Sequence, residues 1–380
     1  MNERVGSGDD VQLRAWAYLT AVAEPPCEPL RKLVAAVGAV EAAAAVRTRK
    51  VPAGHEAVLT ATRARAATDD SARHLERADR LGARLVTPDD PEWPGWSLLA
   101  LSQLDHSIRE REPLALWVRG PARLDEIGDA SIALVGSRAA SSYGEYVAAR
   151  FAGELSAAGW GVLSGGAYGI DGAAHRSALA SGGVTVAVLA CGIDRDYPAG
   201  HGRLLGEIAE RGAVLTEYAP GTSAARHRFL TRNRLVAALS SAVIVVEAAR
   251  RSGAASTAAW ARRLARPVGA VPGSIASATS VGAHRLIADD LAVLVASAEA
   301  VIALAAPDGG GDPGRGSERP TDRLSHEQRR VHDAIPGRGS ATIAEISYAA
   351  GLDTAVVRAA LAAMEVAGLV AGDTSGWQLA

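Results

Sequence analysis

Between residues 131 and 297, short runs of Val, Ile and Leu alternate with polar-faced segments of helical length. The runs are SIALVGS, GVLSGG, VTVAVLACG, AVLTEY, AVIVVEA and PVGAVPG. Each is apolar on both faces, which is typical of parallel strands covered by helices on both sides of a sheet. The pattern therefore predicts a doubly wound α/β domain with a mostly parallel sheet.

The residues before this domain have a helical pattern. Apolar positions recur at helical spacing over 11–47 and 56–82, with interruptions at Glu24-Pro25-Pro26 and at 51–54. We expect a small helical N-terminal domain over residues 1–85, of the helix-hairpin or SAM-like type. Within it, Leu33–Val40 resembles a helix–glycine turn–helix unit, which sometimes contacts a nucleic-acid backbone; a simple helix junction is an equal alternative. Pro113–Gly120 looks like a strand, so the α/β domain with its lead-in segment covers residues 86–305.

The C-terminal part is separated by a segment rich in glycine, proline and charge. Residues 306–322 are expected to form a flexible linker. After it, the pattern predicts helices at 325–334, 343–349 and 354–367 and then two short strands, the element order of a winged helix over 323–380. From residue 322 onward there are seven acids and five arginines, a poor composition for reading duplex DNA, so we expect this domain to contact protein.

Composition limits the choice of partner. A formal net charge of −2 and a pI near 6.5 exclude a uniformly basic DNA-coating protein but allow a local basic patch. Cys27 and Cys191 have no metal-ligand spacing and suggest a reduced, cytoplasmic chain. The sequence predicts no metal, no cofactor, no signal peptide and no membrane partner.

Two glycine-containing turns follow neighbouring strands. Gly136-Ser137-Arg138 ends the first strand, and Ser164–Asp171, with Gly165 and Gly166, follows the second. Such turns can present backbone N–H groups and a positive helix end to phosphate, and both would face the crevice where open α/β sheets bind ligands. The spacing differs from G-x-G-x-x-G, so a dinucleotide is disfavoured, and plain helix capping is the alternative. His175 is expected to be a packed helix residue.

A basic segment beginning at Arg226 carries the most information. Between Glu217 and Glu247 there are four arginines and no acid, and Phe229, one of only two phenylalanines in the chain, lies among them. Arginines interleaved with an aromatic suit a groove that follows single-stranded nucleic acid. The alternative is a solvated basic helix face with Phe229 in the core. The later turn Ser252–Thr257 is expected either to hold phosphate or simply to cap a helix.

These motifs resemble, in order, those of the DprA/Smf family (DNA-processing protein A). The matching segments are VGSRAASSYG, SGGAYGIDGAAH, VAVLACGIDRDYP, TEYAPG, RFLTRNRLVAALSSAVIVVEAARRSGAASTAAWA and AVPG, all within residues 131–290. The resemblance implies a Rossmann-like core that binds single-stranded DNA without sequence preference. It also implies protection of incoming DNA and loading of the recombinase RecA in natural transformation or homologous recombination, without an enzymatic activity.

The resemblance also implies roles for individual residues. Arg226 and Phe229 are expected to contact backbone and base at the groove edge. The remaining expected DNA contacts are Ser137, Arg138, Gly165, Gly166, Arg232, Asn233 and Arg234. A homodimer is implied through the end of the α/β domain near His284, Leu286 and Ile287. The chain departs from the family at Leu230-Thr231, where proline is usual, and at His284 and Asp290, so the details of that loop and of the dimer contact stay open.

Two alternatives remain at this point. Glu247 with Ser252–Thr257 could imitate the site of a nucleotide-binding or nucleotide-hydrolysing protein related to phosphoribohydrolases. A nucleotide-sensing module with the winged helix as its output is a second possibility. The four arginines between Glu217 and Glu247 favour DNA over the hydrolase, because a nucleotide pocket does not need them along one segment. Tighter binding of a small nucleotide than of an oligonucleotide would favour the sensing module.

Overall fold

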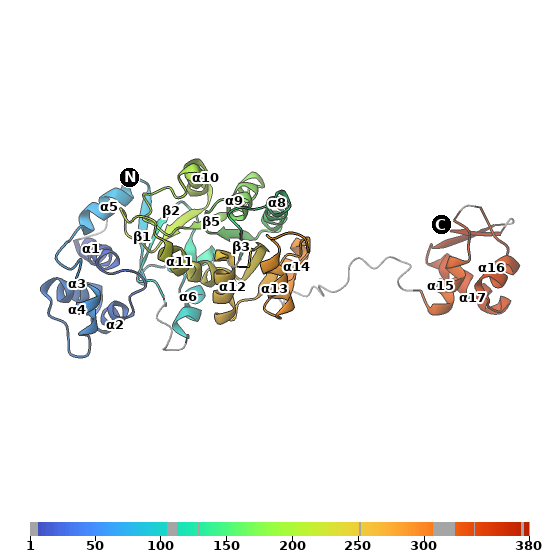
Figure 1. Cartoon of the computed structure of the whole chain (residues 1–380), viewed down its shortest axis with the longest axis horizontal. Coiled ribbons are helices and arrows are strands. Elements are labelled where there is room, and N and C mark those ends of the chain that lie inside the picture. The colour runs from blue at the N-terminus through green and yellow to red at the C-terminus, as the bar shows by residue number, and fades with distance from the viewer. Residues whose placement is uncertain are drawn as a thin grey trace. The chain divides into compact units, whose positions relative to one another are not determined.

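The computed structural model describes residues 7–104, 112–127, 130–250, 252–306, 324–337, 339–373 and 376–379. By its internal contacts the chain divides into two compact units, Met1–Gly311 and Asp312–Ala380, which are described separately (Figure 1). Residues 307–323, which include nearly all of the predicted linker, lie outside the described residues. Within the described ranges, no helix is long and apolar enough to cross a membrane.

The first unit is built on one nine-stranded sheet, with the strand order β1-β2-β6-β5-β4-β3-β7-β8-β9. Its strands are β1 (Ala83–Val86), β2 (Leu116–Arg119), β3 (Ser131–Gly136), β4 (Gly161–Ser164), β5 (Thr185–Val188), β6 (Ala213–Thr216), β7 (Ala242–Glu247), β8 (Val268–Ala270) and β9 (Val293–Leu294). Only β1–β2 and β2–β6 pair antiparallel. The mostly parallel doubly wound sheet is therefore confirmed, and the six apolar runs contain β3 to β8.

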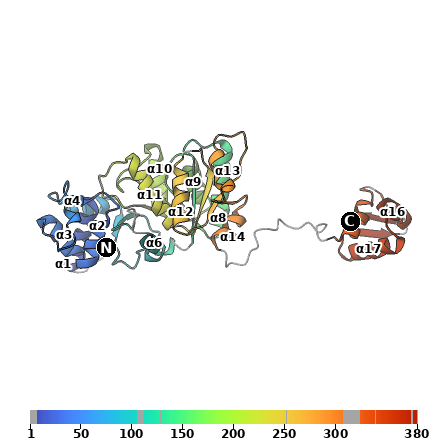
Figure 2. The same cartoon turned by 60° about the horizontal axis from the view of Figure 1, so that its bottom comes forward.

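Helices cover both faces of this sheet, as Figures 1 and 2 show. They are α6 (Gly95–Ser102), α7 (Leu124–Ile127), α8 (Ser142–Ala157), α9 (Ile170–Ala180), α10 (Gly202–Arg211), α11 (Arg226–Ala238), α12 (Gly253–Arg263), α13 (Val281–Ala288) and α14 (Ala298–Ala305), with a short 3-10 helix at Ala199–His201. Alternation along β3 separates the faces: Ile132 and Leu134 pack with α8, α9 and α14, whereas Ala133 and Val135 pack with α11 and α12. The runs are apolar on both faces because each face has its own helical layer.

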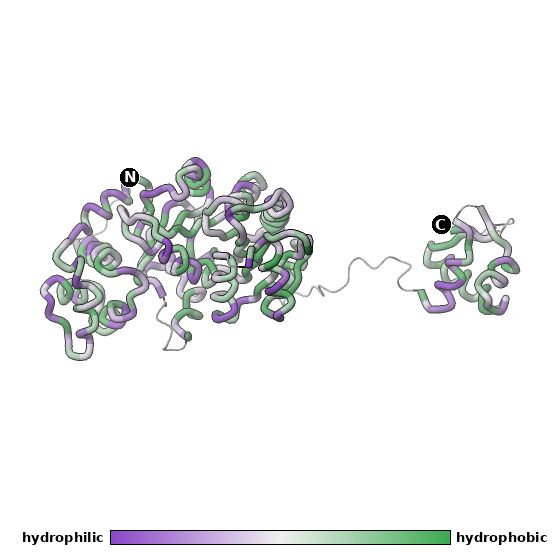
Figure 3. The backbone as a smooth tube through the Cα atoms, viewed as in Figure 1, coloured by the Kyte–Doolittle hydropathy of each residue, from purple (hydrophilic) through white to green (hydrophobic). Residues whose placement is uncertain are grey.

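The N-terminal helices pack onto the end of the sheet that carries β1 and β2. They are α1 (Ser7–Val22), α2 (Glu28–Val37), α3 (Ala39–Thr48), α4 (Ala57–Ala61) and α5 (Ser71–Asp79). Tyr18, Leu30 and Val46 share one hydrophobic cluster with Trp117 of β2 and Val214 of β6. Figure 3 shows hydrophobic segments running through the interior of this unit and hydrophilic ones on its outer helices. The boundary expected after residue 85 falls inside β1, a four-residue edge strand whose pattern is too short to mark a division.

The second unit has its own core. Its elements are α15 (His326–Asp333), α16 (Ile343–Ala350), α17 (Thr354–Val366), β10 (Val370–Asp373) and β11 (Gly376–Leu379). Val331, Ile346, Leu361 and Met364 form a separate hydrophobic cluster, and β10 and β11 form an antiparallel hairpin. Three helices followed by a hairpin is the element order that a winged helix has.

Candidate nucleic-acid interface

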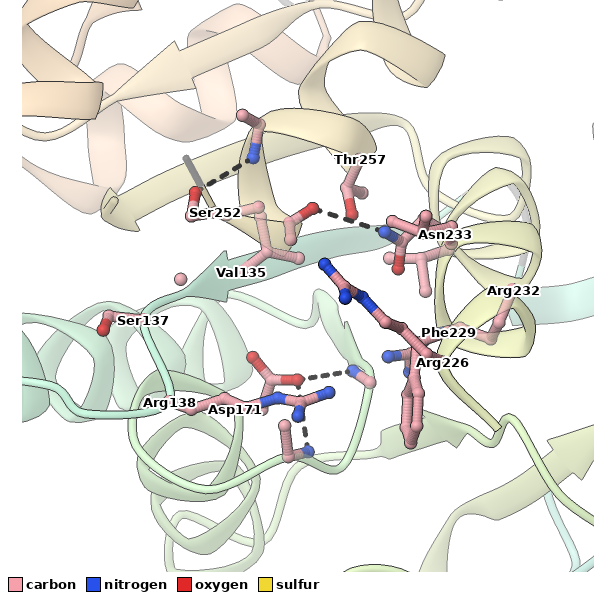
Figure 4. A pocket seen from close by; sticks show the side chains of 18 of the residues that line it. Val135, Ser137, Arg138, Asp171, Arg226, Phe229, Arg232, Asn233, Ser252 and Thr257 are labelled. Carbon is pink, nitrogen blue, oxygen red and sulfur yellow. Dashed lines mark hydrogen bonds between the residues drawn. The ribbon is translucent and has the colours of Figure 1, made fainter. Parts of the chain in front are cut away.

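A groove of about 850 Å³ opens at the carboxyl ends of the central strands. Its walls come from the turns after β3, β4 and β7 and from the first halves of α11 and α12 (Figure 4). From β3 the sheet proceeds through β4, β5 and β6 on one side and through β7 and β8 on the other. The groove thus lies where the winding direction reverses, the place where open α/β sheets bind ligands.

One wall of the groove is an aromatic surface with a cation on it. The guanidinium carbon of Arg138 lies 4.8 Å from the ring centroid of Phe229, a cation–π arrangement. The ring of Tyr197 packs against the ring of Phe229, with 5.1 Å between the two centroids. Phe229 is half-buried and lines the groove, so the alternative that places it in the core does not hold. Sequence reasoning missed Tyr197, although it lies within the family-like segment ending in DYP.

Arg226, Arg232 and Asn233 also line the groove, but at different depths. Arg226 is exposed at the start of α11. Arg232 is only 5% exposed; its guanidinium donates to the carbonyl of Val188, and its Nε has no hydrogen-bond partner among the described residues. Burial lowers the pKa of Arg232, although the nearby charge of Asp171 opposes that shift. Arg226 therefore lies at the rim of the groove, and Arg232 is a buried cation on its floor.

Gly165 makes room for that buried cation. A Cβ atom at Gly165 would lie 2.1 Å from Nη1 of Arg232, far inside van der Waals contact. The absence of a side chain at Gly165 thus lets the guanidinium of Arg232 pack on the turn, which is a different role from the predicted close approach of a phosphate.

The backbone amides of the turn after β4 are already occupied. The N–H groups of Gly165 and Ala167 each donate to Oδ2 of Asp171 over 3.2 Å. Burial raises the pKa of this carboxyl group. Gly166 is not part of the groove lining; its carbonyl oxygen lies 3.0 Å from Nδ1 of His201. The N–H groups of Gly165 and Ala167 are thus bonded to the turn's own carboxylate, and Gly166 lies outside the groove lining, so a phosphate contact at either glycine stays a prediction.

The turn after β3 is also internally bonded. The backbone N–H of Ser137 donates to the carbonyl of Glu247 over 2.9 Å, and the Ser137 hydroxyl donates to the carbonyl of Ala139 over 3.0 Å. Ser137 lines the groove, and next to it the exposed side chain of Arg138 is a donor available to an anion. An anion in the groove would thus meet arginine side chains more than backbone amides.

Arg234 lies outside the groove, contrary to expectation. Its side chain is 0% exposed, and its Nη1 and Nη2 each lie 2.6 Å from a carboxylate oxygen of Glu217, which is itself 2% exposed. Residues two apart on a helix point in different directions, so Arg232 and Arg234 cannot face the same strand. The sequence prediction treated this segment as a continuous basic track and overlooked its helical geometry.

Arg228 is also bound internally. Its Nε and Nη2 donate to the two carboxylate oxygens of Glu24 over 2.6 and 2.9 Å. His227 and Arg65 contact the same carboxylate at 3.1 and 3.0 Å. Burial alone would raise the pKa of Glu24, but these three hydrogen-bonded side chains outweigh it and hold that pKa at about 2, below its ordinary 4.5. Nothing in the local sequence signals this contact, because residues 24 and 228 are 204 positions apart.

The turn after β7 caps a helix. The Ser252 hydroxyl accepts from the N–H of Ala255 over 3.4 Å at the start of α12, and the Asn233 amide donates to the carbonyl of Gly253 over 3.3 Å. This is the plain capping role that the sequence left open. Thr257, the last residue of the segment that the sequence analysis singled out, is 3% exposed and lines the groove from α12.

Glu247 joins three segments beside a second cavity, of about 500 Å³, and is not part of the groove lining. Its carboxylate accepts from the backbone N–H and the hydroxyl of Ser141, over 2.9 and 2.5 Å, and from the hydroxyl of Thr279, over 2.9 Å. His175 is fully buried, with Nδ1 2.7 Å from the hydroxyl of Thr185, and burial lowers its pKa to about 3. His175 is thus a packed residue, as expected.

The residues expected at a dimer contact belong in part to the core of this chain. Nε2 of His284 lies 3.2 Å from the backbone nitrogen and 3.0 Å from the carbonyl of Gly273. Leu286 and Ile287 are half-buried against the hydrophobic cluster under α11 and α12. More apolar surface lies on the neighbouring edge strand β9, where Val293 and Leu294 are 57% and 50% exposed.

Residues 84–306 match the family described as DNA recombination-mediator protein A. A curated relative, the putative DNA processing protein DprA of Mycobacterium tuberculosis, is 51% identical over 375 residues, which cover 97% of this chain and 95% of the relative. The chain belongs to this family. The recognition made from the ordered motifs is therefore confirmed, and this DprA-type chain shares the family's fold.

Two solved DprA structures are similar to the present one. The X-ray structure of DNA processing protein A from Streptococcus pneumoniae is 28% identical, with a TM-score of 0.61 over 79% of this chain and 98% of that one. DNA processing protein A from Helicobacter pylori is 26% identical, with a TM-score of 0.51 over 60% of this chain and 96% of that one. The Helicobacter structure concerns a single-stranded-DNA binding mode.

In this DprA family member, Arg234→Ala should lower the free energy of unfolding by about 3–5 kcal/mol, because it leaves the Glu217 carboxylate buried without its partner. Chemical denaturation of the purified variants measures the change. Replacing both residues by apolar ones, Arg234→Met with Glu217→Leu, should recover most of the loss. Wild-type stability in Arg234→Ala together with weakened DNA binding would instead indicate a role in the groove.

Proposed function

We propose that this chain binds single-stranded DNA without sequence preference, protects incoming strands and loads the recombinase RecA during natural transformation or homologous recombination. The observation that carries the DNA-binding part is the wall formed by Arg138, Phe229 and Tyr197. An aromatic surface beside cations accepts any base by stacking and any phosphate by charge, which is how single strands are bound without reading their sequence.

Charge in the groove supports the same partner. Its lining contains three arginines, Arg138, Arg226 and Arg232, and one acid, Asp171. Arg138 and Arg226 are exposed and can reach phosphates, whereas Arg232 and Asn233 lie on the floor below them. This local excess of positive charge exists in a chain whose overall formal charge is −2, and it gives the groove an attraction for phosphates that the chain as a whole does not have.

The comparisons support the family role. The matching family is described as a DNA recombination mediator, and the Helicobacter relative was solved for its single-stranded-DNA binding mode. Mediation implies delivery of a bound strand to a recombinase, so we propose RecA as the protein partner. We place this activity in the cytoplasm, where RecA and incoming strands meet.

We propose that the chain acts without catalysis. Glu247, the carboxylate on which the hydrolase alternative depends, accepts hydrogen bonds from Ser141 and Thr279 and fastens neighbouring segments together. These contacts favour a structural role for Glu247, and a mononucleotide pocket does not need the three arginines that line the groove.

Substitutions in the aromatic wall should weaken binding to oligo-dT. Arg138→Glu reverses a charge at a phosphate and should nearly abolish binding at physiological salt, while Phe229→Ala should cost about 1–3 kcal/mol of binding free energy. Fluorescence anisotropy of a labelled oligonucleotide measures both. Arg203→Glu is the matched control, because the Arg203 side chain is 93% exposed on α10 outside the groove lining. An equal loss in Arg138→Glu and Arg203→Glu would indicate non-specific electrostatics, and unchanged affinity in Phe229→Ala would exclude stacking on its ring; either result contradicts the assignment.

The C-terminal unit should contribute little to strand binding. From residue 322 onward it has seven acids and five arginines, and α17, the helix in the recognition position, carries one cation, Arg358, and one acid, Glu365. A chain ending at residue 320 should keep its single-strand affinity within a few-fold of the full chain. Anisotropy of both proteins with the same oligonucleotide tests this. A large loss of affinity in a folded truncated chain would show that the unit binds DNA despite its charge.

We propose that two copies associate through α13 and β9, with His284, Leu286 and Ile287 at or beside the contact. When one groove of a dimer has bound a DNA strand, the second groove is at a high effective concentration for the same strand. The exposed Val293 and Leu294 on the edge strand β9 form an apolar surface that a second copy can cover. Light scattering at micromolar protein should give a dimer mass, and Leu294→Glu should give a monomer. A monomeric wild-type chain would contradict this contact.

A further inference from the structure

The first turn of α11 lacks the stabilisation that helices usually have at their N-terminus. It begins with Arg226-His227-Arg228, which places basic side chains at the positive end of the helix dipole. It has no acid in its first turn, and its N-cap residue, Ala225, has no side-chain acceptor. By contrast, α8 and α12 are capped by Ser141 and Ser252. The turn that carries Phe229 at its end is therefore weak on local grounds.

An acid from a distant part of the chain lies at the N-terminus of α11. Glu24, between α1 and α2, accepts two hydrogen bonds from Arg228 and one from His227. The Arg228 side chain is only 13% exposed, lies over the Tyr218 ring at 5.3 Å, and also donates to the carbonyl of Ser223. Glu24 thus supplies, from the N-terminal helices, the negative charge that α11 lacks in its own sequence.

Cavities flank this turn on both sides. A cavity of about 530 Å³ between the N-terminal helices and the 218–223 loop is lined by Thr222, Ser223, Arg228 and Glu24. The next residues, 224–226, line the DNA groove. One short segment therefore separates the two cavities, and the Glu24–Arg228 pair crosses from one side to hold it.

We propose that Glu24 is a positioning residue for the groove: by holding Arg228 it fixes the first turn of α11, and so places Arg226 and Phe229 for a single strand. The N-terminal helices are then part of the DNA-binding apparatus, although they contribute no residue to the lining of the groove. This inference rests on the single-strand function proposed above.

The direction in which DNA affinity changes when Glu24 is removed separates this positioning role from simple electrostatics. Removing an acid near a DNA site reduces repulsion and frees Arg228, His227 and Arg65 for phosphates, which would tighten binding. Loss of a positioning contact acts in the opposite direction, because the strand must then order a frayed turn when it binds.

The test compares Glu24→Ala and Glu24→Gln with Asp70→Asn in the full chain, by anisotropy with labelled oligo-dT. Asp70 lines the same cavity but pairs with Arg73, so its substitution makes the same change of charge without touching α11. We expect Glu24→Ala to weaken binding about three- to tenfold and Asp70→Asn to leave it unchanged or slightly tighter. Glu24→Gln, which keeps the size and one acceptor, should be intermediate.

Two further measurements show whether the effect acts through α11. Amide hydrogen exchange over residues 226–230 should accelerate in Glu24→Ala while β3 and β7 keep their protection. In combination with Phe229→Ala, Glu24→Ala should add little further loss, because both changes remove the same stacking contact. A global loss of stability would instead accelerate exchange throughout and give additive losses.

Binding by Glu24→Ala as tight as or tighter than wild type would overturn the inference, as would unchanged exchange over residues 226–230. Failure of the wild-type chain to bind oligo-dT would overturn the proposed function instead, and the exchange measurement would still decide whether Glu24 holds the turn. If Glu24→Ala does not fold, Glu24→Gln carries the same comparison.

Discussion

Burial of the central sheet on both faces is the constraint on which the rest of this structure depends. Apolar strands such as β3 and β7 must be covered by helices on either side, and parallel strands covered in this way end together at one edge. The turns after β3, β4 and β7 therefore meet, and the reversal of winding between β3 and β7 keeps the helices that follow them apart. The groove is a consequence of how the sheet is buried.

Several backbone donors of the turns that line the groove are bonded within the chain. Asp171 accepts from the amides of the turn after β4, and the carbonyl of Glu247 accepts from Ser137. The proposed binding therefore depends on side chains, namely the exposed Arg138 and Arg226 and the rings of Phe229 and Tyr197. Side chains of this kind adapt to any base, whereas a rigid cradle of amides would suit one phosphate geometry. A sequence-independent single-strand binder is consistent with this division.

The sheet could be predicted because each strand is a run of Val, Ile and Leu with no polar interruption, and the ordered motifs identified the family. The individual roles along Arg226–Arg234 could not be predicted by the same means. Arg228, Arg232 and Arg234 have identical chemistry, yet one is held by Glu24, one lies on the groove floor and one is buried with Glu217. The partner of each arginine depends on the direction in which its side chain leaves the helix and on residues distant in sequence. Local composition shows neither the direction nor the distant partner. The same holds for Gly165, whose small size makes room for Arg232.

The most direct test of the account is equilibrium binding of the full chain to one oligonucleotide as a single strand and as a duplex. The account predicts tighter binding to the single strand by about tenfold or more, with similar affinity for strands of different sequence, because stacking on Phe229 and Tyr197 needs unpaired bases. Affinity should fall as salt rises, because phosphate contacts release counterions. Equal or tighter binding to the duplex, or strong preference for one sequence, would contradict the assignment of this groove.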